Sequence, residues 1–82
     1  MMPTPDSLRA LIDEQLFPLD PGVADDADLH AEGLDSMALM QLILLLEAEF
    51  GITITPADLG RENFTSLKNL AAFVAGKQSH AT

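Results

Sequence analysis

Apolar residues recur at helical spacing in three segments of this chain, and residues that start or stop helices border each segment. The first segment follows Thr4 and Pro5, a hydroxyl cap before a proline at the first helical position. It predicts a helix from about Pro5 to Leu16. The second segment is the most strongly patterned and predicts a helix over Ser36–Phe50, with Gly51 as its stop signal.

The rest of the C-terminal half predicts a last helix and two short connecting segments. The last helix begins at Thr65 or Ser66 and runs to Ala75, and Gly76 with Lys77 ends it. Thr55-Pro56 opens only a short helical turn, and Gly51–Thr55 alternates like a strand that has no partner, so we expect an extended connector. The predicted fold is all-α: a small helical bundle with three main helices, one short helix and a long loop between the first two helices.

That loop, Phe17–Asp35, shows no sustained periodicity and contains many acidic residues but no Lys or Arg. Most of it is therefore expected to be solvated, with Val23 and Leu29 contacting the core. We expect His30 to be a solvated residue of this loop. A loop of this length is uncommon in a compact domain and is usually either functional or partly disordered.

Composition limits the classes of function. With 82 residues, one domain is expected, spanning residues 1–82 with an ordered core over about 5–76 and a mobile tail over 77–82. The formal net charge is −9, which repels phosphate backbones and anionic lipids, so we expect neither nucleic acid nor a membrane as partner. There is no cysteine to form a disulfide or a thiolate metal site.

Neither a signal peptide nor a membrane span is recognisable. The N-terminus lacks a basic start and an apolar stretch, and the longest apolar run, Leu42–Leu46, is too short to cross a bilayer. We therefore expect a cytoplasmic protein. We also expect it to be a monomer.

The predicted second helix is apolar on two nearly opposite sides. Its core stripe is expected to comprise Leu39, Leu42, Ile43, Leu46 and Phe50. The opposite side, where a bundle helix normally carries charge, instead has Met37, Met40, Gln41, Leu44 and Ala48. Either neighbouring segments cover both sides, or the second side stays exposed as a docking surface. We favour docking, because a small domain has few segments to cover the stripe and methionine adapts to several partners.

The loop enters this helix through Gly33-Leu34-Asp35-Ser36-Met37, where Asp35 or Ser36 is the expected N-cap. Asp28-Leu29 lies a few residues ahead of this motif, and further residues after the motif continue the pattern toward the C-terminus. These further residues are Leu42, Leu46, Glu47, Phe50, Gly51, Ile52, Ile54, Thr65, Leu70 and Val74. Over about residues 29–74, the spaced pattern in an acidic helical chain resembles the acyl carrier protein family.

The resemblance implies that Ser36 is the attachment point of a covalent 4′-phosphopantetheine arm, transferred from coenzyme A by a phosphopantetheinyl transferase. The arm holds an acyl group as a thioester, and the protein has no catalytic residue and is no enzyme. Asp35 matches the acidic residue that the transferase reads. The face that touches partner enzymes matches Met37, Met40, Gln41, Leu44 and Glu47.

One departure concerns the kind of carrier. Fatty-acid-type carriers place glutamate where this chain has Gln41, Leu44 and Ala48, so docking is expected to be more hydrophobic here. Residues 58–65 look instead like the corresponding segment of discrete D-alanyl carrier proteins, although Phe64 stands where that family tends to have tryptophan. The resemblance thus implies a stand-alone aminoacyl or short-acyl carrier of natural-product biosynthesis. Its expected partners are an adenylating ligase and acyltransferase or synthase enzymes.

The alternative from another class is an acidic helical adaptor that binds a partner through Met37, Met40 and Leu44, with Ser36 only a helix cap. A calcium-binding loop is disfavoured, since no register of the acidic loop gives the glycine and glutamate that an EF-hand needs, and we expect no metal site. Ser36, Asp35 and His30 lie close in sequence, but such adjacency is not the geometry of a catalytic triad.

Overall fold

The computed structural model describes residues 2–80, which form an all-helical domain without strands. This confirms the predicted fold class. The elements in chain order are α1 (Pro5–Gln15), α2 (Leu29–Glu32), α3 (Ser36–Phe50), the 3₁₀-helices η1 (Pro56–Asp58) and η2 (Arg61–Phe64), and α4 (Leu67–His80).

The predicted boundaries of the first two long helices are confirmed almost residue for residue. Thr4 is the N-cap of α1, where its hydroxyl accepts a hydrogen bond from the Ser7 N–H at 3.1 Å and Pro5 occupies the first helical position. α3 ends at Gly51, whose φ of 65° is the left-handed conformation that glycine adopts without a steric penalty. Local capping chemistry therefore fixes both helices.

The predicted end of the last helix is wrong. α4 begins at Leu67, after Ser66, whose hydroxyl accepts from the Asn69 N–H at 3.1 Å, and it continues through Gly76 to His80. An ion pair between Lys77 and Asp58 of η1 joins this extra turn to the rest of the fold. A glycine inside a helix costs only about 1 kcal/mol, which such tertiary contacts can offset. Residues 77–80 of the predicted tail are thus helical, and 81–82 lie outside the described residues.

The segment between α1 and α3 is more structured than predicted. It contains the single turn α2, and several bonds join it to the long helices. Arg9 of α1 donates to the Val23 carbonyl at 2.6 Å and to the Asp25 carboxylate at 2.7 Å, and the Lys68 N–H of α4 donates to the Asp25 carbonyl at 2.8 Å. The expected contacts of Val23 and Leu29 with the core are present.

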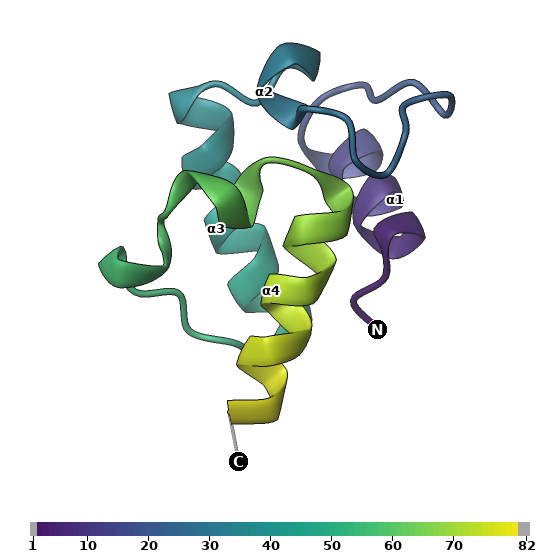
Figure 1. Cartoon of the computed structure of the whole chain (residues 1–82). Coiled ribbons are helices and arrows are strands. Elements are labelled where there is room, and N and C mark those ends of the chain that lie inside the picture. Colours follow the sequence, from purple (N-terminus) through teal and green to yellow (C-terminus); the bar gives the residue numbers. More distant parts are fainter. Residues whose placement is uncertain (1, 81–82) are drawn as a thin grey trace.

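The helices enclose one core, and α4 packs against α1, η2 and α3 (Figure 1). In Figure 1, α2 and the start of α3 lie at one end of the bundle, and α4 finishes at the other end. Of the predicted core stripe of α3, Leu42, Leu46 and Phe50 are buried, whereas Leu39 and Ile43 are half-buried against the core. Because Ser36 is the first residue of α3, the motif that contains it lies at the same end of the bundle as α2 (Figure 1).

Candidate functional site

Ser36 is the first residue of α3, and its side chain is exposed. Asp35 is the N-cap: its carboxylate accepts a hydrogen bond from the Ala38 N–H at 2.8 Å. This decides between the two expected caps. The Asp35 side chain rather than that of Ser36 caps the Ala38 N–H, and the Ser36 hydroxyl makes no hydrogen bond within residues 2–80. The structure thus presents an unengaged hydroxyl at the start of a long helix.

The turn before Ser36 requires glycine and a buried leucine. Gly33 has a φ of 131°, and a Cβ added there would lie 3.1 Å from the ring of Phe17. Leu34 is only 2% exposed, and its N–H donates to the Leu29 carbonyl at 3.0 Å. A packed turn therefore supports the exposed serine.

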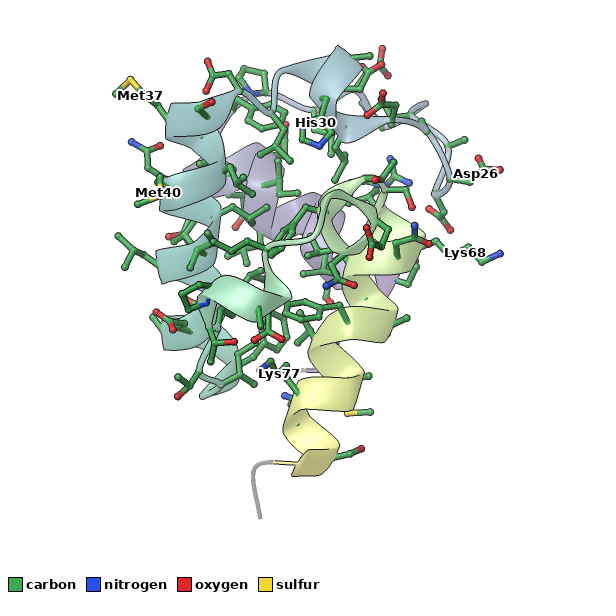
Figure 2. The ribbon with its side chains drawn as sticks, turned by 60° about the vertical axis from the view of Figure 1, so that its left-hand side comes forward. Asp26, His30, Met37, Met40, Lys68 and Lys77 are labelled. Carbon is green, nitrogen blue, oxygen red and sulfur yellow. The ribbon has the colours of Figure 1, made fainter. Side chains whose placement is uncertain are left out.

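Beyond Ser36, one face of α3 is apolar and open to solvent. Met37 is 76% exposed, Met40 64% and Leu44 66%, and Gln41 on the same side is also exposed. Figure 2 shows Met37 and Met40 on the outer side of α3, directed away from the bundle. We call Met37, Met40, Gln41 and Leu44 the α3 face. The predicted exposure of these residues is confirmed, since no other segment of residues 2–80 covers them.

Glu47 differs from the other residues predicted to touch partners. It is half-buried, and its carboxylate accepts a hydrogen bond from the Ile54 N–H at 2.9 Å. This bond fixes the connector between α3 and η1, whose Ile52 side chain is buried. Glu47 therefore has a structural role, and the α3 face itself carries no charge. Nothing in the sequence pattern distinguishes this internal bond from a surface charge.

The prediction that His30 is solvated is wrong. Its side chain is half-buried in α2, with Nδ1 3.0 Å from the Leu34 carbonyl oxygen, and Nε2 is buried without a hydrogen-bond partner among the described residues. Sequence reasoning missed α2 although both of its caps are readable. Asp28 accepts from the His30 N–H at 2.9 Å as the N-cap, and Gly33 ends the turn.

Two absences concern the described residues alone. Within residues 2–80, no three His, Asp or Glu side chains are grouped in a way that could hold a metal ion. In the same range, no helix combines the length and the apolar character needed to span a membrane.

Comparisons with known proteins agree with this geometry. Residues 6–74 match the family model described as phosphopantetheine attachment site. An aminoacyl carrier protein of Agrobacterium fabrum is 46% identical over 56% of this chain, although the match spans only 55% of that relative. A D-alanyl carrier protein of Streptococcus suis is 38% identical over 74% of this chain and 78% of its own length.

Solved structures give the same result. The fold matches a chain in the crystal structure of the Bradyrhizobium japonicum glycine:[carrier protein] ligase complexed with its cognate carrier protein and an analogue of glycyl adenylate. The TM-score is 0.68 and the identity 30%, over 88% of this chain and 91% of that chain. The resemblance found in the sequence is confirmed, and so is the predicted cofactor, a covalently attached 4′-phosphopantetheine. The chain belongs to the family of carrier proteins that have a phosphopantetheine attachment site.

Proposed function

We propose that Ser36 carries the 4′-phosphopantetheine arm and that the protein presents an aminoacyl or short-acyl group to biosynthetic enzymes. The observation that carries this proposal is the exposed, unengaged Ser36 hydroxyl at the first position of α3, next to its cap Asp35. A phosphopantetheinyl transferase must reach this oxygen, which loses its proton and forms a bond to the phosphorus next to the pantetheine part of coenzyme A, while the P–O–P bond breaks and adenosine 3′,5′-bisphosphate leaves. No described side chain covers the oxygen.

The start of α3 also suits a phosphodiester. Asp35 occupies the Ala38 N–H, and the N–H groups of Ser36 and Met37 have no partner among the described residues. Unpaired amides and the positive end of the helix dipole stabilise negative charge at this place. The chain therefore supplies an attachment oxygen, and its free amides and helix dipole offset part of the repulsion that the Asp35 carboxylate exerts on the linkage formed there.

When the arm is attached, its thiol would hold the acyl or aminoacyl group as a thioester. The remaining task of the protein is to hold and deliver, which raises the effective concentration of the cargo at a docked enzyme. We infer that the chain is not itself a catalyst. The α3 face is the proposed docking surface, and its lack of charge implies mainly apolar contacts.

We propose an adenylating ligase as the loading partner. Supporting this, the relatives are named aminoacyl and D-alanyl carrier proteins, and the similar solved structures contain a glycine:[carrier protein] ligase. Acyltransferase or synthase enzymes of natural-product biosynthesis would then take up the cargo. We place this activity in the cytoplasm, with the carrier as a monomer.

Mass spectrometry of transferase reactions tests the role of Ser36. Incubation with coenzyme A, magnesium and a broad-specificity phosphopantetheinyl transferase is expected to add one phosphopantetheinyl group to the wild-type protein and none to Ser36→Ala. Ser79→Ala, which removes an exposed hydroxyl from α4, is the matched control and should be modified like the wild type.

Circular dichroism should show the same helical signal for both variants, because neither side chain is buried. Folded wild-type protein that gains no mass, or a Ser36→Ala variant that is still modified, would contradict the proposal. The first of these outcomes would favour the adaptor function, in which Ser36 belongs only to the helix start.

A further inference from the structure

His30 contacts the peptide unit between Leu34 and Asp35, which directly precedes Ser36 in the chain. The Leu34 carbonyl oxygen lies 3.0 Å from His30 Nδ1, and the Asp35 N–H at the other end of the same peptide unit donates to the Gly33 carbonyl at 2.9 Å. The peptide that leads into Asp35 and Ser36 is therefore held at both ends. Rotation of this peptide would break both bonds.

The surroundings of the imidazole define its tautomer. A carbonyl oxygen only accepts hydrogen bonds, so His30 Nδ1 must carry the hydrogen that reaches Leu34. Nε2 is buried without a partner in the described part of the chain. A hydrogen on Nε2 would be a buried donor without an acceptor, which is costly. Both nitrogens therefore favour the tautomer with hydrogen on Nδ1.

The rest of α2 is fixed independently of this ring. Asp28 accepts from the His30 N–H at 2.9 Å, and the Leu29 N–H donates to the Thr65 carbonyl at 2.7 Å, which ties α2 to the segment before α4. Figure 2 shows His30 on the inner side of α2, facing the rest of the molecule. The imidazole is thus attached to a rigid support on one side and to the turn before Ser36 on the other.

We propose that His30 is a positioning residue for the modification of Ser36. The bond from Nδ1–H to the Leu34 carbonyl keeps the turn at the start of α3 in the conformation that a transferase binds. This inference rests on the proposed function of Ser36. Without the bond, the turn occupies this conformation for a smaller fraction of the time. The apparent affinity for the transferase falls in proportion to that fraction.

Three substitutions separate the hydrogen bond from packing. His30→Asn keeps an N–H group on Cγ, the atom that bears Nδ1, and so retains the donor to Leu34 while losing volume. His30→Leu retains volume without a donor, and His30→Gln places its amide one atom farther out. His80→Asn, at the last residue of α4, is the matched control, since α4 finishes at the end of the bundle opposite to α2 (Figure 1).

Transfer kinetics with the broad-specificity transferase are the first readout. For His30→Leu and His30→Gln, the KM for the carrier should rise about threefold to tenfold, as expected for the loss of one hydrogen bond, with kcat changed by less than about twofold. His30→Asn and His80→Asn should stay within about twofold of the wild type. The inference is overturned if His30→Leu matches the wild type, or if His30→Asn is impaired as much as His30→Leu.

Nuclear magnetic resonance of the wild-type protein gives a second readout that needs no substitution at His30. Long-range ¹H–¹⁵N correlation at slightly alkaline pH should show hydrogen on Nδ1 of His30, with His80→Asn used for assignment. Hydrogen on Nε2 instead would overturn the inference. If the tautomer is as stated but wild-type Ser36 is never modified, the proposed function fails and the positioning role fails with it. Modification with normal kinetics in His30→Leu removes the positioning role alone.

Discussion

Asp35 combines two properties that a sequence motif does not separate. Its carboxylate caps α3 through the Ala38 N–H, and it places a negative charge beside the exposed Ser36. The capping bond is a property of the fold, whereas recognition of the charge by a transferase is part of the proposed function. An amide at this position keeps the oxygen acceptor and removes only the charge.

Substitutions of Asp35 should therefore separate stability from modification. Asp35→Ala is expected to lower the free energy of unfolding by about 1 kcal/mol, because the Ala38 N–H loses its partner. Asp35→Asn should cost less than about 0.5 kcal/mol, since asparagine is an equally good cap. Both variants should slow phosphopantetheinyl transfer. Urea unfolding followed by circular dichroism measures the first effect, and transfer kinetics the second.

A wild-type transfer rate for Asp35→Asn would mean that the transferase does not read the charge. Loss of stability in Asp35→Asn as large as in Asp35→Ala would instead contradict the capping role. Met37→Leu, an exposed change outside the cap, should leave the unfolding free energy unaltered within about 0.5 kcal/mol.

At the scale of a single element, some leucines of α3 are buried in the core and another is exposed on the α3 face. Leu42 and Leu46 are fully buried, whereas Leu44 between them is 66% exposed. The same helix thus contributes to the core on one side and presents the α3 face on the other. Hydropathy alone does not distinguish these leucines, but the helical spacing does, because residues two positions apart point in very different directions.

Leu44 and Leu46 form a matched pair for testing this division. Leu44→Gln keeps helix propensity and should change the free energy of unfolding by less than about 0.5 kcal/mol. It should raise the KM for the carrier in the transferase reaction about threefold to tenfold, as loss of an apolar interface contact does. Leu46→Ala should behave in the opposite way, losing about 2 to 5 kcal/mol of stability.

Urea unfolding and transfer kinetics on the same two variants make this comparison. If Leu44→Gln is destabilised as strongly as Leu46→Ala, the exposed position of Leu44 is wrong. If it is stable and its KM is unchanged, the α3 face does not dock the transferase.

At the scale of the whole molecule, polar contacts join segments that are far apart in the sequence. Asp58 of η1 pairs with Lys77 of α4, and its carboxylate also accepts from the Thr55 N–H at 2.9 Å. Two hydrogen bonds hold the pKa of Asp58 below its usual value of 3.8. The bond with Lys77 has the larger effect, and the bond with the Thr55 N–H has the next largest. The side chain keeps contact with solvent, so this contribution to stability is modest.

The direction of the pH dependence follows from this lowered pKa. A group whose pKa is lower in the folded state stabilises the fold above its unfolded pKa, and this stabilisation is lost as the pH falls through the folded value. The stability difference between wild type and Asp58→Asn should therefore be constant near neutral pH. It should shrink once the pH drops below about 4.

Urea unfolding over a series of pH values measures this difference. The shrinkage should be smaller in a Lys77→Gln background, where the principal cause of the lowered pKa is gone. A difference that grows in acid would contradict the assigned direction. An unchanged profile in the Lys77→Gln background would contradict the role of the lysine.

Success and failure of the sequence-based predictions follow the range of the interactions involved. The boundaries of α1 and α3 and the exposure of the α3 face were predictable because caps and helical spacing act over a few residues. The extension of α4 past Gly76 and the anchoring of the loop by Arg9 were not, since both depend on distant partners. The internal bond of Glu47 with Ile54 falls in the same class.

The sequence by itself determined the family, the all-helical class, the exposed apolar side of α3 and the motif around Ser36, because each is encoded by neighbouring residues or by their spacing. Only the structure decided that Asp35 rather than Ser36 caps the helix and that His30 is turned inward to the Leu34 carbonyl, and only the tertiary structure decided that α4 continues past Gly76 to pair with Asp58. The physical reason is that a hydrogen bond needs its two groups in contact and aligned: spacing along the chain does not say which of two adjacent side chains meets this condition, and it says nothing of a partner that is distant in the sequence.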